Sequence, residues 1–82
     1  MSNTTKLRRI GTHEAETAAN TRTGFWDHWA YMNDEYVLIP DGQRHAHPGE
    51  TTHWSIYATG GTGERIHRTK LLAEARIWVA NQ

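Results

Sequence analysis

The C-terminal segment "TKLLAEARIWVA" constrains the fold more than any other part of the chain. Thr69 stands where a helix N-cap residue belongs, directly before a run of helix formers. On a helical wheel the core-facing candidates fall within an arc of about 120°: Leu71, Leu72, Ala75, Trp78 and Val79. Ile77 falls outside this arc. The segment therefore predicts a C-terminal helix that covers one face of a neighbouring element.

The preceding segment predicts a β-hairpin under that helix. Residues 54–59 alternate, with Trp54 and Ile56 on one face and Tyr57 on the other, which is the period of a half-buried strand. "GGTG" then reverses the chain. Residues 64–68 alternate again, and Ile66 is expected to face the core.

The stretch "FWDHWAYMNDEYVLIPDG" predicts further strands because it is dense in aromatic and β-branched residues. Asn33 and Asp34 suit a two-residue hairpin turn, since both tolerate positive φ. This turn predicts strands near residues 28–32 and 35–39, and "PDG" is expected to end the second one. Residues 25–32 could instead form a short helix, because their aromatic residues do not alternate cleanly.

These patterns predict an α+β fold with a small antiparallel sheet of three to four strands and one C-terminal helix packed on one face. Residues 24–82 are expected to form this single domain. Residues 1–23 contain only Leu7 and Ile10 as large apolar residues, so we expect a flexible N-terminal tail. Within it, "THEAETAAN" could form a transient helix with Thr12 as its cap.

Length and composition favour a small cytoplasmic protein. The 82 residues include no cysteine, so neither a disulfide framework nor a thiolate zinc site is expected. No apolar run reaches the roughly 18–20 residues that span a bilayer, and no secretory signal is recognisable at the N-terminus. Nine basic residues balance nine acidic ones, but residues 24–59 carry one arginine against five carboxylates. Basic ends therefore flank an acidic middle.

Catalytic, metal and cofactor sites are not expected. His45 and His47, with His53 or His67, could approach a metal, but "HAHP" reads as a loop without strand or helix support. Ser55 has no base at a predictable distance. "GGTG" is not followed by the Gly-Lys-Ser/Thr and helix of a phosphate-binding loop, so a hairpin turn is the preferred interpretation. We expect a non-enzymatic protein.

The uncovered face of the predicted sheet is the first candidate binding surface. If Trp54 and Ile56 pack under the helix, the opposite face carries His53, Tyr57, Arg65 and His67. Cations beside an aromatic ring suit contacts to phosphates and bases. A wet, polar face is also what any one-layer sheet presents to water.

The order strand, glycine turn, basic strand and Thr-Lys helix resembles the arm-type DNA-binding domain of phage tyrosine recombinases. The matching positions are Trp54, Tyr57, Gly63, Arg65, Thr69, Lys70, Glu74, Ala75 and Trp78. The resemblance implies a bacteriophage or mobile-element accessory protein in the host cytoplasm. It also implies that Tyr57, Arg65, His67 and Arg68 face double-stranded DNA. The acidic middle segment departs from the basic sheets of that family.

The alternative is a protein-binding module that acts on a host factor or forms a homodimer. One helix cannot cover four tryptophans and three tyrosines, so an apolar patch is expected at Trp26, Trp29, Tyr31 and Ile77. An open sheet edge could also pair with another chain.

Overall fold

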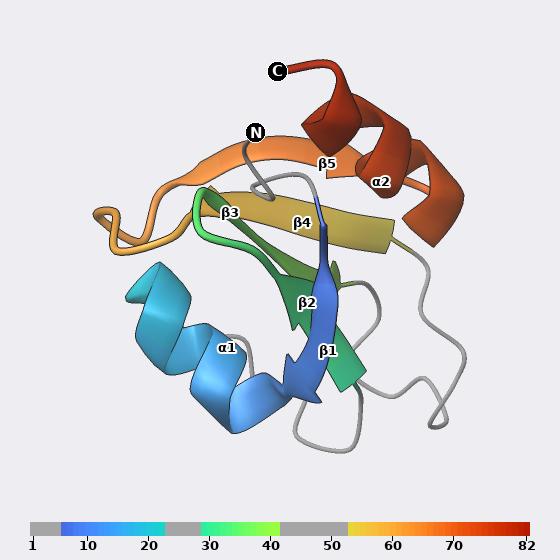
Figure 1. Ribbon diagram of the computed structural model, residues 1–82. Coiled ribbons are helices and arrows are strands. Elements are labelled where there is room, and N and C mark those ends of the chain that lie inside the picture. Colours follow the sequence, from blue (N-terminus) through green and yellow to red (C-terminus); the bar gives the residue numbers. More distant parts are fainter. Residues whose placement is uncertain (1–5, 23–28, 42–52) are drawn as a thin grey trace.

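The computed structural model describes residues 6–22, 29–41 and 53–82. The described elements are β1 (Arg8–Gly11), α1 (Thr12–Ala19), β2 (Trp29–Met32), β3 (Tyr36–Asp41), β4 (His53–Ala58), β5 (Arg65–Thr69) and α2 (Leu72–Ala80). The strands form one antiparallel sheet in the order β1-β2-β3-β4-β5, so each strand pairs with the next one along the chain. Figure 1 shows this sheet between the two helices.

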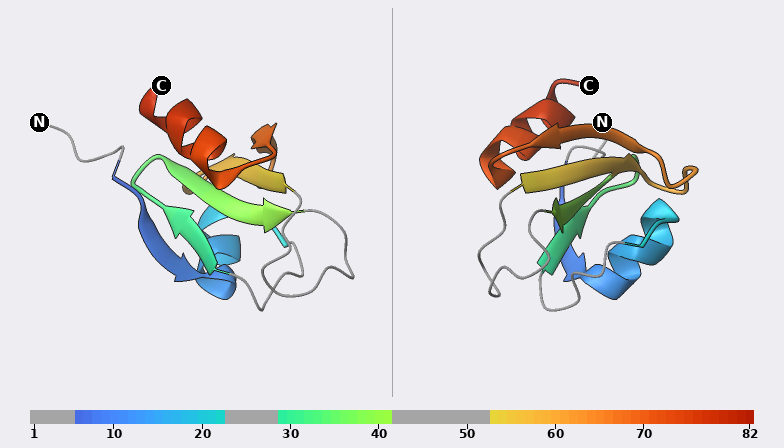
Figure 2. Two further views of the ribbon diagram at one scale, coloured as in Figure 1. Left: turned by 90° about the vertical axis from the view of Figure 1, so that its right-hand side faces the viewer. Right: turned by 180° about the vertical axis from the view of Figure 1, so that it is seen from behind.

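The two helices lie on opposite faces of the sheet and cover different halves of it (Figures 1 and 2). Helix α1 packs on β1, β2 and β3, whereas α2 packs on β4 and β5. The α1 side has a core cluster of Ile10, Ala15, Ala19, Ala30, Met32, Val37, Ile39 and Tyr57. The α2 side has a second cluster of Leu38, Ile56, Ala75 and Val79, with half-buried aromatic residues around it.

Strand β3 is buried on both faces because it lies at the centre of the sheet. Val37 and Ile39 belong to the α1 cluster, while Leu38 between them belongs to the α2 cluster. The uninterrupted apolar run "VLIP" is typical of a strand covered on both sides, where alternation is not required. The α+β class, the antiparallel sheet and the C-terminal helix are confirmed. The expectation of one helix on one face, with three to four strands, is wrong.

The expectation of a flexible tail over residues 1–23 is wrong for residues 8–19. Strand β1 pairs with β2 from Arg8↔Met32 to Gly11↔Trp29, and α1 follows without a break. Ala15 and Ala19 are fully buried, because their small side chains let α1 lie close to the sheet. Few apolar residues suffice here, since distant strands supply most of the cluster. Thr12 is buried as the first residue of α1 and does not cap it, because the N-cap position is Gly11.

The glycine turn between β4 and β5 packs against the C-terminal end of α1. Asn20 ends the helix in the left-handed region, with φ 58° and ψ 44°. The Gly60 amide donates a hydrogen bond to the Ala18 carbonyl at 2.7 Å. Gly63 has φ +89°, and a Cβ atom there would collide with the Asn20 carbonyl oxygen. The predicted chain reversal is confirmed, and the turn also joins α1 to the sheet.

The hairpin between β2 and β3 is confirmed, but its turn differs from the prediction. The Asn33 side-chain oxygen accepts hydrogen bonds from the backbone amides of Glu35 and Tyr36, at 2.8 and 2.7 Å. This side-chain turn makes positive φ unnecessary, and Asn20 is the single non-glycine residue with positive φ among those described. The strand interpretation holds for Trp29–Met32, whereas residues 23–28 lie outside the described residues.

Pro40 does not end its strand. Strand β3 continues to Asp41, and Pro40 stands opposite Trp54 of β4. Strand β3 pairs with β2 only at Val37 and Leu38 among the described residues. The missing N–H of Pro40 therefore interrupts no described pairing between β3 and β2.

Helix α2 begins later than Thr69, which is the last residue of β5. The N-cap is Leu71, whose backbone N–H donates to the Glu74 side chain at 3.1 Å. The Thr69 hydroxyl donates instead to the Leu71 carbonyl at 2.9 Å. Leu71 is 61% exposed, so its assignment to the core is wrong, whereas the exposure of Ile77 is confirmed.

Candidate interaction surfaces

The residues predicted to bind DNA do not share one open face. Tyr57 is only 9% exposed and packs in the α1 cluster, while His53 is half-buried. His67 lies on the opposite side, where its ring stacks on Trp78 of α2. The single uncovered face assumed from the sequence is therefore wrong, because α1 covers half of it.

An irregularity in the β4–β5 pairing explains the place of His67. Ile56 stands opposite His67, but Tyr57 stands opposite Arg65, so Ile66 has no partner across the ladder. An extra residue of this kind reverses the side to which the following residues point. His67 consequently shares the α2 side with Ile56. Ile66 is 48% exposed, and the expectation that it faces the core is wrong.

Arg65 and Arg68 gather around one carboxylate on the side of the sheet that carries α1. The Arg68 Nε atom lies 3.0 Å from Asp41 Oδ2, and Arg65 Nη1 lies 3.5 Å from the same oxygen. The Ser55 hydroxyl donates to that oxygen at 3.0 Å. Both arginine side chains stay partly exposed, at 47% for Arg65 and 39% for Arg68. We call Asp41, Ser55, Arg65 and Arg68 the arginine cluster.

A groove of about 390 Å³ runs between β5 and α2. The His67 and Trp78 rings stack within it, with centroids 5.0 Å apart and planes inclined by 13°. Ile77, which is 61% exposed, also lines the groove. The full lining is His67, Arg68, Thr69, Lys70, Glu74, Ile77 and Trp78. We call it the β5–α2 groove.

The apolar patch predicted for a protein partner separates into two places. Ile77 belongs to the β5–α2 groove, whereas Trp29 and Tyr31 lie on β2. The Arg9 guanidinium lies 4.5 Å from the centroid of the Trp29 ring, and that of Arg76 lies 4.8 Å from the Tyr31 ring. Trp29 remains 56% exposed. Trp26 lies outside the described residues.

Sequence reasoning missed Asp41 and the groove-lining role of Trp78. The sequence places Asp41 in a turn after the strand, and no local pattern connects it with two arginines more than twenty residues later in the chain. The helical wheel predicts a core position for Trp78, and its ring does pack edge-on against Tyr36, with ring centroids 5.4 Å apart. Its contact with His67 depends on the irregular pairing of β4 and β5, and no local sequence pattern predicts that irregularity.

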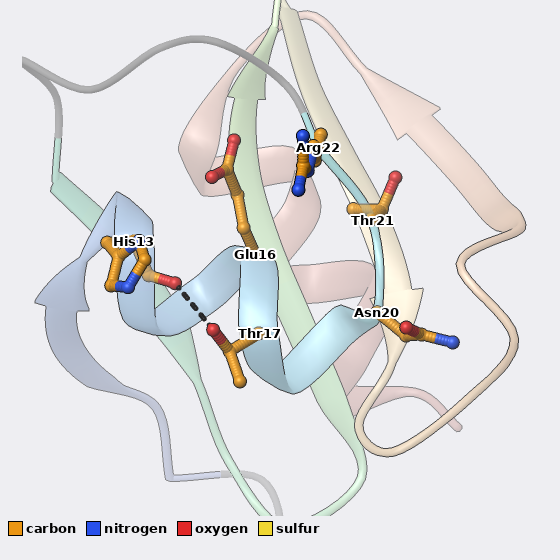
Figure 3. A pocket seen from close by; sticks show the side chains of 6 residues that line it. All are labelled: His13, Glu16, Thr17, Asn20, Thr21 and Arg22. Carbon is orange, nitrogen blue, oxygen red and sulfur yellow. Dashed lines mark hydrogen bonds between the residues drawn. The ribbon is translucent and has the colours of Figure 1, made fainter.

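A second hollow, of about 520 Å³, lies beside α1 and the residues that follow it (Figure 3). Its lining is polar: His13, Glu16, Thr17, Asn20, Thr21 and Arg22. The Thr17 hydroxyl donates to the His13 carbonyl at 3.1 Å, so it is engaged within its own helix rather than with a base.

Within the described ranges, no group of three or more potential ligand residues could hold a metal ion. His45 and His47 lie outside them. None of the described helices is long and apolar enough to cross a membrane.

Comparisons with protein-family models, with curated proteins and with solved structures found no match. The resemblance to recombinase arm domains therefore stays a prediction. The candidate surfaces stand on their geometry alone.

Proposed function

We propose that this chain is a non-enzymatic protein-binding module that takes up an extended segment of its partner along β5. The observation that carries the proposal is the exposure of this strand. Among the described strands it lies at one edge of the sheet, and Arg65, Ile66, His67 and Arg68 are all exposed. An edge strand offers backbone hydrogen-bonding groups to a further strand, and strand addition is a common mode of peptide recognition.

The side chains around this edge support the same function. Three of the four large apolar residues that are strongly exposed among those described belong to this part of the chain. Ile66 lies on β5, Leu71 is the N-cap residue of α2, and Ile77 lies on α2. Exposed apolar side chains gathered at one place mark interaction surfaces, whereas single ones scattered over a surface do not. The β5–α2 groove lies directly beside the edge and supplies a pocket for partner side chains.

Selection from a displayed library of random twelve-residue peptides tests this function. We expect enriched peptides whose binding falls at least about tenfold when the groove is altered by Ile77→Glu. Thr17→Glu, an exposed substitution on α1, is the matched control and should leave binding unchanged. Binders that are equally insensitive to both substitutions, or no binders at all, would contradict the proposal.

A second candidate function is DNA binding, which the arginine–aromatic contacts favour. Arg9 and Arg76 stack on aromatic rings, and the exposed ring of Trp29 offers a platform for a base. Arg65 and Arg68 would add phosphate contacts. Electrophoretic shifts at low salt should then show binding that weakens steeply as salt rises and that Arg65→Ala reduces. The absence of any shift with duplex and single-stranded DNA would refute this candidate.

A further inference from the structure

The two sides of the exposed β5 edge differ in chemistry, and this difference indicates what a partner strand must carry. Successive side chains of a strand point to opposite faces of the sheet. Arg68 stands opposite Ser55 and belongs to the arginine cluster on the α1 side. His67 stands opposite Ile56 and lies in the β5–α2 groove on the other side. A strand added to β5 would therefore alternate between these two environments.

The α1 side of the edge carries an excess of positive charge. One carboxylate, Asp41, serves both Arg65 and Arg68, and its contact with Arg68 at 3.0 Å is the closer one. Because both guanidinium groups remain partly exposed, each keeps N–H donors for a further acceptor. Strand β5 itself contains no carboxylate. Acidic side chains of a partner strand would meet these donors.

The α2 side of the edge is suited to apolar side chains. The stacked rings of His67 and Trp78 line the groove, and Ile77 contributes an exposed aliphatic side chain. Burying such surface against an apolar partner side chain is favourable, because it removes apolar area from water. The lining also includes Arg68 and Lys70 against one carboxylate, Glu74, so basic side chains outnumber acidic ones next to the apolar contact.

We propose that the partner segment is an extended strand in which acidic and apolar residues alternate. This inference rests on the protein-binding function proposed above and specifies its ligand. Acidic residues would face Arg65 and Arg68, and apolar residues would enter the β5–α2 groove. A second copy of the chain fits less well, because pairing two β5 strands would gather four arginines on one ribbon, where like charges oppose each other. A nucleic acid would meet the arginines but could not continue the backbone ladder.

Fluorescence anisotropy with labelled heptapeptides tests the inference. The probe alternates glutamate and valine; one control has the same composition in two blocks, and another alternates lysine and valine. At low salt we expect the alternating acidic peptide to bind at least about tenfold more tightly than the lysine peptide. It should also bind more tightly than the block peptide. Salt should weaken this preference.

Two variants locate the interaction. Replacing both cluster arginines, by Arg65→Gln with Arg68→Gln, should abolish the preference for the acidic peptide, whereas the exposed control Arg22→Gln should retain it. Ile77→Ser should weaken both valine-containing alternating peptides, because they lose an apolar contact. Circular dichroism of each variant verifies that the fold is retained, and all four positions are exposed.

The outcomes separate this inference from the proposed function. Equal affinity for the glutamate and lysine peptides, or a preference that survives the double arginine variant, would overturn the inference. If the library-selected peptides still depended on Ile77, the protein-binding function would stand without it. An oligonucleotide that competes for β5 and binds more strongly than the acidic peptide would overturn both the protein-binding function and the inference of an acidic partner strand. If sedimentation showed concentration-dependent dimerisation that covers β5, the partner would be a second copy of the chain and the inference of an acidic partner strand would be overturned.

Discussion

Substitutions in the glycine turn between β4 and β5 measure how firmly this turn holds α1 to the sheet. Gly60 and Gly63 both have positive φ, at +71° and +89°. Around Gly60, a Cβ atom would meet nothing within 4 Å, whereas at Gly63 it would collide with the Asn20 carbonyl oxygen. The two glycines therefore share a backbone requirement but differ in contact with the end of α1.

This difference gives the expected magnitudes. Gly60→Ala should lower the free energy of unfolding by about 1 kcal/mol, the strain of placing a side chain in the left-handed region. Gly63→Ala adds the displacement of a helix-terminal carbonyl, so we expect a loss of about 3 kcal/mol or more. Asparagine tolerates positive φ better than alanine does. Gly60→Asn should therefore be nearly neutral, while Gly63→Asn should stay strongly destabilising because its Cβ atom remains.

Urea unfolding followed by tryptophan fluorescence measures the four variants. For a chain of this size the dependence on urea is about 1 kcal/mol per M, so Gly60→Ala should move the midpoint by about 1 M. Gly63→Ala should move it by about 3 M, or leave the chain unfolded without urea. Equal losses at the two positions, or recovery of Gly63→Asn to the level of Gly60→Asn, would refute the packing of the turn against α1.

Three further predictions test the core, the N-terminal segment and the start of α2. Leu38→Ala should lower the free energy of unfolding by about 2–5 kcal/mol in urea titrations, because Leu38 is fully buried in the α2 cluster. Ile77 is exposed, so Ile77→Ala should change the same free energy by less than about 0.5 kcal/mol. Ala15→Asp should cost more than about 2 kcal/mol, because it buries a carboxylate under α1; an unchanged midpoint would restore the flexible-tail interpretation. Glu74→Ala should lower the thermal midpoint by the equivalent of about 0.5–1 kcal/mol, because the Leu71 amide loses its acceptor. Thr69→Val should have a smaller effect, and the reverse order would support Thr69 as the cap.

Patterns contained within one segment predicted their elements well. The alternation in β4 is confirmed, with Ile56 on the α2 side and Tyr57 on the α1 side, and α2 forms with Ala75 and Val79 buried. In both segments the residues that define the period lie within a few positions of one another. The run "VLIP" is also informative, because consecutive apolar residues indicate a strand covered on both faces, whereas alternation indicates a strand covered on one face.

The surfaces were harder to predict, because each depends on contacts between distant residues. Asp41 becomes part of a site only when β5 brings Arg65 and Arg68 beside it. His67 reaches Trp78 only because one extra residue shifts the β4–β5 pairing. Neither contact can be predicted from the local spacing of residues.

The sequence by itself determined the α+β class, the β4 strand and its alternation, and the amphipathic C-terminal helix, because hydrophobic periodicity selects local structure directly. Only the tertiary structure decided that residues 8–19 form a strand and a helix, that both faces of the sheet are partly covered, and that β5 is left at an edge. Helix α1 is short and rich in alanine, and an isolated helix of this length is marginal in water. It is stabilised by packing against the sheet, where most of its partners lie later in the chain. The register of β5 was likewise set by its neighbours, and that register decides which side chains a partner would meet.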